Sequence, residues 1–474
     1  MQHARSVLSA LVVFAPGVTP LTGCADAAES FDMARAPLAP ALEPGSLDPT
    51  FAGDGVAIVD TGALDLGKAV VVQRSRKGDR VLVAGKTTGD PSTDFLLVRL
   101  DPAGVPDPDF GQDGNGRVIT DFDGAMDEGK GLAILPDGDI VLAGITTRDG
   151  NGSFGVVRYS KNGKFDTRFG VDGFAIADFD KGNDEGKAVA VQRCGPDESN
   201  TCIVMAGKAE APGGLGDVAL ARFTSKGELD PNFGVGSAVG DGRVTTDLDG
   251  GNDEANAIEV LADGRIVVGG QSGPHGAASF LVLQYDPDGT LDEQFGESGG
   301  YTLLPFEDAT NSLAFSLAID DEDRILLAGV TFGDDGDSDM VVVRFTSKGL
   351  PDTGFGDGGI RVIDGLLQDQ ATAVEVDADG RIIIAGKSTY IGAAKNADVD
   401  SWFSVVRLLD NGDADDDFGQ VDGRALHTPL IKVPSTDADD GAYAMTIQRD
   451  GKIVVVGEHF NGNNDDLVVM RLVP

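Results

Sequence analysis

The feature that most constrains this chain is a short motif that recurs seven times, at intervals of about sixty residues. In its fullest form the motif reads Leu-Asp-x-x-Phe, and its Asp and Phe are present in every copy. The phenylalanines of the motif are Phe51, Phe110, Phe169, Phe233, Phe295, Phe355 and Phe418. A period of this length predicts one architecture built from copies of a single supersecondary unit, although 474 residues would otherwise suggest several domains.

Each unit contains four strand-like runs rich in β-branched residues. In the sixth unit the runs are 359–363, 371–376, 381–386 and 402–407, with the turn pair Asp379-Gly380 between the second and the third. The 67 glycines suit short strands that are joined by tight turns. Sustained helical periodicity is absent from the mature sequence. We therefore predict an all-β chain, a seven-bladed β-propeller of four-stranded blades.

The two ends of the repeat array are each incomplete. The run Val56–Val59 has no preceding unit, and the last unit ends at Pro474 after three runs. If the second run of a unit is innermost, the first run is the outermost strand of the preceding blade. We therefore expect Val56–Val59 to pair beside 467–472 and to complete the last blade, which removes two open sheet edges.

The runs carry motifs that resemble those of a known family. The patterns Ala-Val-x-Val-Gln, Asp-Gly-Arg-Ile-Val-Val-x-Gly, Asp-Phe-x-x-x-Arg and Leu-Asp-x-x-Phe-Gly are similar to the bacterial delta-sixty repeat. The resemblance covers residues 47–474. It implies an exported or envelope protein without a generally established activity, and it provides no catalytic residues to transfer.

The amino terminus reads as a targeting segment. Residues 1–23 have a polar start and a short apolar stretch that ends at Leu21-Thr22-Gly23-Cys24, which resembles a bacterial lipobox. In a lipobox, Cys24 becomes the lipid-modified first residue. The alternative is an ordinary signal peptide cleaved within 25–28. Residues 24–46 are rich in Ala and Pro and are predicted to be a tether, followed by a single propeller over 47–474. The expected location is the cell envelope, anchored by lipid, or the exterior.

The other two cysteines lie close together in the sequence. Cys194 and Cys202 flank the segment at which other units have a hairpin turn. Strands that leave one hairpin place such residues opposite each other, so we predict a disulfide.

Residues that recur in every unit are expected to serve the fold. A glycine ends each third run, which indicates a bend or a close backbone approach. An arginine in the fourth run recurs in six units and is replaced by Gln284 in the remaining unit, and we expect it to pair with the Asp of the motif. The glycines are Gly85, Gly144, Gly207, Gly270, Gly329, Gly386 and Gly457, and the arginines are Arg99, Arg158, Arg222, Arg344, Arg407 and Arg471.

An aspartate also precedes the second run in six units. These residues are Asp65, Asp127, Asp184, Asp253, Asp369 and Asp440. The loop before the second run should open at one mouth of a central channel, on the face that carries the variable loops between third and fourth runs. We therefore predict a ligand-binding face that includes Asp65, Asp369, Asp440, His459 and Trp402.

Three successive units carry an acidic run in this loop. The runs are Asp121, Asp123, Asp127 and Glu128; Asp178, Asp180, Asp184 and Glu185; and Asp247, Asp249, Asp253 and Glu254. Hard oxygen ligands at this density are candidate ligands for Ca²⁺, although no copy matches a full EF-hand loop. The alternative is a turn whose aspartates accept hydrogen bonds from their own backbone amides.

The net charge and the motifs limit the classes of function that this chain can have. A net charge of −41 disfavours nucleic acid, and it disfavours a membrane contact other than a lipid anchor. Four histidines and no catalytic motif give poor signals for an enzyme. We expect a binding or scaffold module for a protein, a glycan or a small cationic ligand. The alternatives are a propeller enzyme with a calcium-dependent site at the channel mouth, and a structural or adhesive envelope component.

Overall fold

The computed structural model describes most of the chain after residue 41. The described ranges are 42–88, 92–179, 182–195, 200–210, 214–234, 241–248, 250–274, 277–306, 309–333, 336–364, 368–391, 399–419, 424–427 and 440–474. They lie in one compact unit, Leu42–Pro474. Over these ranges the chain forms only strands, bridges and turns, so they hold no helix long and apolar enough to cross a membrane.

The strands form antiparallel sheets that follow the order of the chain. The first sheet contains β2 (Asp65–Gln73), β3 (Arg80–Thr88), β4 (Thr93–Leu100) and β5 (Arg117–Thr120). The second contains β6 (Asp127–Ile134), β7 (Ile140–Thr146), β8 (Ser153–Tyr159) and β9 (Phe174–Ala177). The third contains β10 (Glu185–Cys194), β11 (Asn200–Glu210), β12 (Gly216–Thr224) and β13 (Arg243–Thr246). The fourth contains β14 (Glu254–Val260), β15 (Ile266–Ser272), β16 (Ser279–Tyr285) and β17 (Tyr301–Leu304).

The next sheet joins two sets of four antiparallel strands through one parallel bridge, between Ser338 and Gln368. Its first set is β18 (Ala309–Ile319), β19 (Ile325–Gly333), β20 (Ser338–Phe345) and β21 (Ile360–Ile363). Its second set is β22 (Gln368–Val376), β23 (Ile382–Ile391), β24 (Val399–Leu408) and β25 (Arg424–His427). The last sheet has the order β1 (Val56–Val59), β28 (Asp465–Leu472), β27 (Ile453–Phe460) and β26 (Gly441–Ile447).

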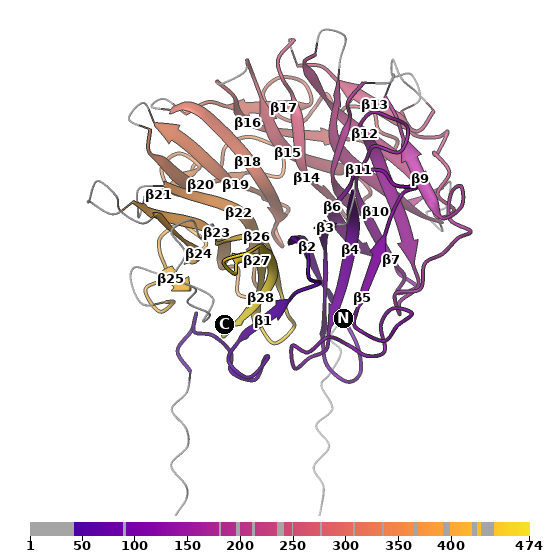
Figure 1. Ribbon diagram of the computed structural model, residues 1–474. Helices are drawn as coiled ribbons and strands as arrows, with labels where there is room; N and C mark the ends of the chain where they lie inside the picture. Colours follow the sequence, from indigo (N-terminus) through magenta and orange to yellow (C-terminus); the bar gives the residue numbers. More distant parts are fainter. Residues whose placement is uncertain are drawn as a thin grey trace, which may run out of the picture. The chain divides into compact units, whose positions relative to one another are not determined.

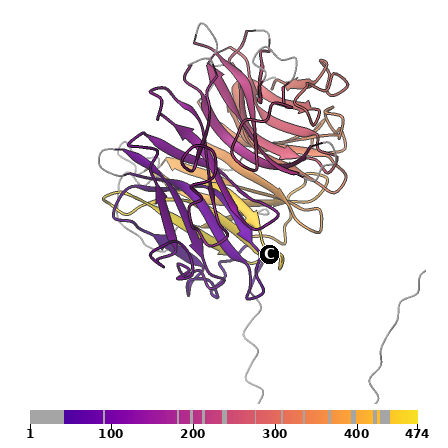
Figure 2. The same ribbon diagram turned by 90° about the vertical axis from the view of Figure 1, so that its right-hand side faces the viewer.

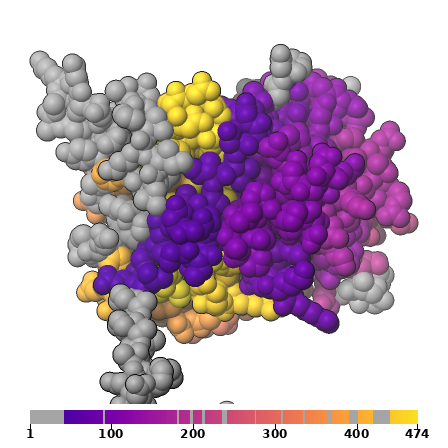
Figure 3. Space-filling model, turned by 60° about the horizontal axis from the view of Figure 1, so that its bottom comes forward, coloured from indigo at the N-terminus to yellow at the C-terminus, as the bar shows by residue number. Residues whose placement is uncertain are grey.

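The last sheet unites the two ends of the folded chain. Strand β1 pairs antiparallel with β28, with Val56 opposite Met470 and Val59 opposite Leu467. The predicted pairing of these two segments is therefore confirmed. In Figures 2 and 3 the indigo start of the folded chain lies beside the yellow strands from its end. This pairing covers an edge of the last sheet that would otherwise be open.

The first strand of each set is an inner strand. The inner strands are β2, β6, β10, β14, β18, β22 and β26. Each inner strand contacts the next one in the chain, and β26 contacts β2. Figure 1 shows the sheets side by side around a common centre, with these strands towards it.

The apolar core lies between neighbouring sheets. Val81 and Val83 of β3 pack in one cluster with Val454 and Val456 of β27, and all four side chains are fully buried. Similar clusters join the other neighbouring sheets. The middle strands are buried on both faces, which explains why their sequences are continuous apolar runs that do not alternate with polar residues.

An arginine links successive units. Arg99 is fully buried, its Nε lies 3.0 Å from Asp107 Oδ2, and its guanidinium stacks 4.4 Å from the ring centre of Phe110. Its Nη1 also donates to the carbonyl of Lys161, in the next unit, at 2.7 Å. The same ion pair and the same stacking recur at Arg222, Arg344, Arg407 and Arg471. We call this arrangement the arginine joint.

One arginine departs from the predicted pairing. Arg158 pairs with Asp139 at 2.7 Å, and Asp166 of the motif pairs instead with Arg168. This unit thus has a second arginine, Arg168, which takes the carboxylate that Arg158 would otherwise bind. Arg158 still donates to the next unit, through Nη1 to the carbonyl of Ser225 at 2.9 Å.

A backbone hydrogen bond accompanies every joint. The residue after each motif phenylalanine donates its N–H to a carbonyl in the next unit, seven residues before that unit's phenylalanine. The donor and acceptor pairs are Ala52 and Ala103, Gly111 and Asn162, Gly170 and Lys226, Gly234 and Asp288, Gly296 and Lys348, Gly356 and Asn411, and Gly419 and Pro44. The final bond, 3.1 Å long, returns from the last motif to the residues that precede the first.

We predict that Arg99→Met destabilises the protein by about 3 kcal/mol, because it removes one of the two arginines that pair with the buried Asp107 carboxylate, and with it the charge-assisted hydrogen bond to the carbonyl of Lys161. Denaturant unfolding measures this loss. The matched control is Arg168→Met, which removes an ion pair from a side chain that is 89% exposed. The control should cost far less, because the Arg168 ion pair is exposed to solvent, and equal losses in the two variants would refute the structural role of the joint.

Candidate functional site

The aspartates that precede the inner strands close their own loops. Asp127 is fully buried, and its Oδ2 accepts the N–H of Phe122 at 2.8 Å. Asp184 and Asp253 accept equivalent bonds, each at 2.7 Å, from the residue five positions earlier. Asp65 accepts the N–H of Thr61 at 2.6 Å. These contacts are those of the capping alternative that the sequence left open.

The other candidate calcium ligands have different surroundings. Asp123 pairs with Arg148 at 2.6 Å, whereas Glu128, Glu185 and Glu254 all face lysines. The backbone carbonyl of Asp178 accepts a bond from Arg243. Asp180 and Asp249 lie outside the described residues.

The structure nevertheless brings carboxylates together in groups of three. Asp94, Asp121 and Asp127 each place one oxygen within 4.8 Å of the others, and two further triads are formed at equivalent positions of other units. The further triads are Asp217 with Asp247 and Asp253, and Asp466 with Asp60 and Asp65. The sequence interpretation missed Asp94, Asp217 and Asp466, because they come from the fourth run of the neighbouring blade. Their signal was the Asp of the Asp-Phe-x-x-x-Arg pattern.

Burial and mutual repulsion act on the first triad. Burial raises the pKa of Asp127 to about 6, and the charges of Asp121 and Asp94 add to this shift, while the N–H of Phe122 opposes it. Burial and the charge of Asp121 also raise the pKa of Asp94. Oδ1 of Asp127 is buried and accepts no hydrogen bond from the described residues. The donor set is therefore compatible with a hard cation, and calcium at this position stays a prediction.

The residues of the predicted ligand face are mostly buried. Asp65 and Asp369 are fully buried, and Asp440 accepts the backbone N–H of Phe460 at 3.2 Å and lies 2.8 Å from His459 Nδ1. Trp402, on β24, is half-buried.

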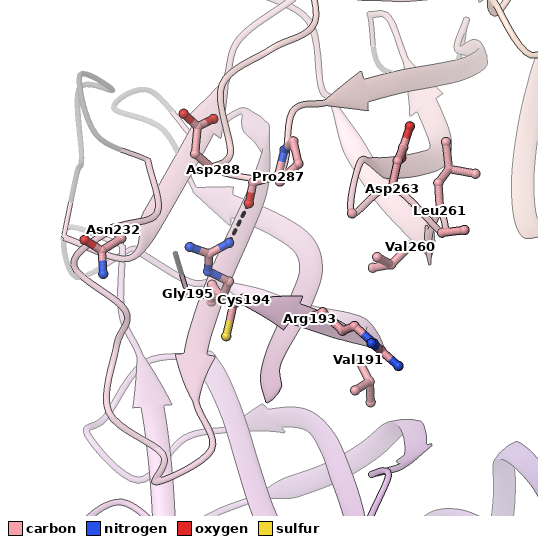
Figure 4. A pocket seen from close by; sticks show the side chains of 13 residues that line it. Val191, Arg193, Cys194, Gly195, Asn232, Val260, Leu261, Asp263, Pro287 and Asp288 are labelled. Carbon is pink, nitrogen blue, oxygen red and sulfur yellow. Dashed lines mark hydrogen bonds between the residues drawn. The ribbon is translucent and has the colours of Figure 1, made fainter. Parts of the chain in front are cut away.

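Cys194 and Cys202 form a disulfide across the hairpin of β10 and β11, as the sequence predicts. A cavity of about 510 Å³ lies beside it, between this hairpin and the turn after β14. Figure 4 shows Arg193 and Asp263 among the residues that line it. Arg222 also lines the cavity and donates a hydrogen bond to the carbonyl of Pro287. A second cleft, of about 640 Å³, lies at the equivalent junction of the last and first units and contains Arg471. Both clefts thus adjoin arginine joints, which indicates that the packing of units creates them.

A different cavity lies at the centre of the sheets. It has a volume of about 210 Å³, and residues of all seven inner strands line it. Each inner strand has a β-bulge, at which its register against the next strand skips one residue. The skipped residues are Lys68, Lys130, Lys187, Asn256, Phe315, Thr372 and Tyr443, and all of them line the cavity. We call this space the central cavity and these seven positions the bulge positions.

The repeated glycine of the third run explains the bulge. A Cβ at Gly85 would lie 1.8 Å from the carbonyl oxygen of Leu66, and one at Gly144 would lie 1.9 Å from that of Glu128. Only glycine lets the inner strand's carbonyl approach so closely, as the sequence predicts. The residue two positions after this carbonyl, Lys68 or Lys130, falls out of register and lines the cavity.

The bulge positions are chemically unequal. Lysines occupy three successive inner strands, β2, β6 and β10, while Phe315, Thr372 and Tyr443 occupy the last three. Three further lysines lie near the bulge positions, on the strands that pair with β2, β10 and β22. They are Lys86, Lys208 and Lys387. Six lysines thus gather here in a chain whose net charge is −41. The sequence interpretation missed this group, because which strand residue bulges depends on tertiary register.

Comparisons with known proteins agree with a propeller. Five segments, 79–110, 135–169, 261–295, 323–355 and 448–474, match the family described as "Domain of unknown function (DUF5122) beta-propeller". Together they cover about a third of the chain. A search of curated proteins found no match. The matched segments and the four-stranded antiparallel sheets establish a β-propeller fold that is built from repeats.

Several solved structures resemble this chain at low sequence identity. Drosophila Semaphorin 2a is 8% identical, over 91% of this chain and 76% of that one, with a TM-score of 0.44. A glucose dehydrogenase is 10% identical, over 73% and 95%, with a TM-score of 0.39. An ulvan lyase of polysaccharide lyase family PL25 is 11% identical, over 73% and 80%, with a TM-score of 0.40. Resemblances at this level carry no inference about activity.

We predict that Asp127→Asn changes how stability depends on pH. The pKa of Asp127 is about 6 in the folded protein and near 3.8 when unfolded, so folding takes up a proton between these values. The wild type should therefore gain stability relative to the variant as pH falls from 7 to 4, by at most about 3 kcal/mol. Urea unfolding of both proteins in a chelator measures the difference, and a pH-independent difference would contradict the assignment.

The same two proteins test the calcium prediction. An ion held by the triad stabilises only the folded state. Millimolar Ca²⁺ should therefore raise the urea midpoint of unfolding of the wild type more than that of Asp127→Asn. Equal responses of the two proteins would reject calcium at this triad.

Proposed function

We propose that this chain is an exported, seven-bladed propeller that acts as a ligand-binding module through its central cavity. Seven inner strands in successive contact, with β26 against β2, support seven blades in a closed ring. The pairing of β1 with β28 and the bond from Gly419 to Pro44 support closure by the chain's own ends.

A contrast between two sets of positions carries this proposal. Where the seven units carry the same residue, as at the motif Asp and the third-run Gly, that residue holds the units together or permits the bulge. At the bulge positions five residue types are found, and all of them meet in one cavity. Diversity on an invariant scaffold is typical of a binding site. The alternatives of an enzyme and of a structural envelope component have no comparable observation in their favour.

We further propose that Cys24 anchors the propeller to a membrane, with residues 24–46 as the connecting segment and 1–23 removed. The support is the sequence Leu21-Thr22-Gly23-Cys24 and the hydrogen bond of Gly45 to Val473, which ties the start of the folded unit to the propeller. Mass spectrometry of the mature amino terminus should find acyl groups on Cys24. An unmodified terminus beyond this residue would contradict the anchor.

We predict that filling the central cavity abolishes binding. Thr372→Trp adds an indole at a bulge position, whereas the control Val105→Trp adds the same ring where the side chain is 53% exposed. Thermal unfolding is followed with a panel of small anions, cations and neutral compounds. At least one compound should raise the midpoints of the wild type and of Val105→Trp but not that of Thr372→Trp. A panel without effect, or a full response of Thr372→Trp, would refute the proposal.

A further inference from the structure

The three lysines of the central cavity have unequal partners. Lys187 faces Glu254 and lies 3.7 Å from Glu185. Lys130 has its nearest carboxylate, Glu128, at 3.8 Å. Lys68 has no carboxylate within 4.0 Å among the described residues, and its Nζ lies 3.1 Å from the ring centre of Tyr443. Lys68 and Lys130 therefore retain ammonium hydrogens that can donate to a ligand.

The glutamates that face the lysines balance only part of the positive charge around the cavity. Burial lowers the pKa of Lys68 to about 8, and the charges of Lys86 and Lys130 lower it further against the opposing effect of Glu458 and Glu128. Burial also lowers the pKa of Lys187 to about 8, with Lys130 and Lys208 adding to the shift against Glu185. An anion between these groups would relieve the repulsion.

The part of the cavity wall that β18, β22 and β26 form carries no lysine at its bulge positions. Phe315, Thr372 and Tyr443 present an apolar surface. Both hydroxyl groups already have partners, because Thr372 donates to the carbonyl of Ala442 at 2.9 Å and Tyr443 bonds to Glu458. Glu375 is the one carboxylate among the lining residues, and burial together with Glu259 raises its pKa to about 8. A raised pKa favours the uncharged acid, so Glu375 repels an anion less than an ordinary carboxylate would. The volume of about 210 Å³ corresponds to about seven water molecules, which suits a small ligand.

We infer that the central cavity binds a small organic anion, whose charged group contacts Lys68 and Lys130 and whose body rests against Phe315 and Tyr443. This inference rests on the proposed binding function and adds the chemical class of the ligand. It differs from the small cationic ligand that the sequence suggests beside a protein or a glycan, because lysines line this cavity although the net charge of the chain is −41. A carboxylate, a phosphate monoester or a sulfate ester each supplies the required charge.

Isothermal titration calorimetry with a matched set of probes tests the inference. Benzoate, phenyl phosphate and phenyl sulfate carry the three kinds of anion on one ring, while benzyl alcohol and benzylammonium carry the same ring without charge and with positive charge. At least one anion should bind the wild type. Lys130→Gln should weaken it about tenfold, because one charge-assisted contact is lost. Lys77→Gln, which removes a lysine from an exposed turn, should bind as the wild type does.

The outcomes separate this inference from the proposal on which it rests. If benzyl alcohol or benzylammonium binds as tightly as the anions, and Thr372→Trp abolishes that binding, the cavity is a binding site but its ligand is not an anion. If an anion binds equally to the wild type, Lys130→Gln and Thr372→Trp, it binds elsewhere and the inference is wrong. If no probe of any charge binds the wild type, both the inference and the proposed binding site are rejected.

Discussion

The arginine joint is the interaction on which the rest of this structure depends. In five units a buried guanidinium holds the motif aspartate, stacks on the motif phenylalanine and, in most of them, reaches a carbonyl of the next unit. A buried charge is stable only when its partners are in place, so each joint fixes where the next unit must sit. The accompanying amide bond repeats seven times and ends on Pro44, so the same geometry that propagates the array also terminates it.

The glycine that ends the third run of each unit permits the bulge that places a side chain in the central cavity. Its missing Cβ admits the inner strand's carbonyl, the strand bulges, and one side chain per unit turns into the central cavity. Because the joints orient the units around a common centre, seven bulge positions that are far apart in the sequence become neighbours. The units can then differ at these positions without cost to the joints, since Lys68, Phe315 and Tyr443 take no part in them.

Much of the fold could be predicted from the sequence, because the period itself carries the information. The motif phenylalanines mark the units, the turn pairs mark the strands, and the missing strand at each end predicts the pairing of Val56–Val59 with the last strand. The disulfide followed from the position of Cys194 and Cys202 around one hairpin. The site could not be predicted in the same way. Its lysines depend on a one-residue register shift, and one partner of Asp127 in its triad, Asp94, comes from another strand. The sequence suggested the acidic loops as a site because aspartates are frequent there. In the structure these aspartates mainly accept backbone hydrogen bonds that close turns.

A crystal structure of the mature protein tests the central claim most directly, namely that the packing of successive units brings the bulge positions together. The account predicts that β26 lies against β2, that the N–H of Gly419 bonds to the carbonyl of Pro44, and that Lys68, Lys130 and Lys187 face one cavity. A gap between β26 and β2, or bulge residues that point into the sheets and not into a common space, would contradict it.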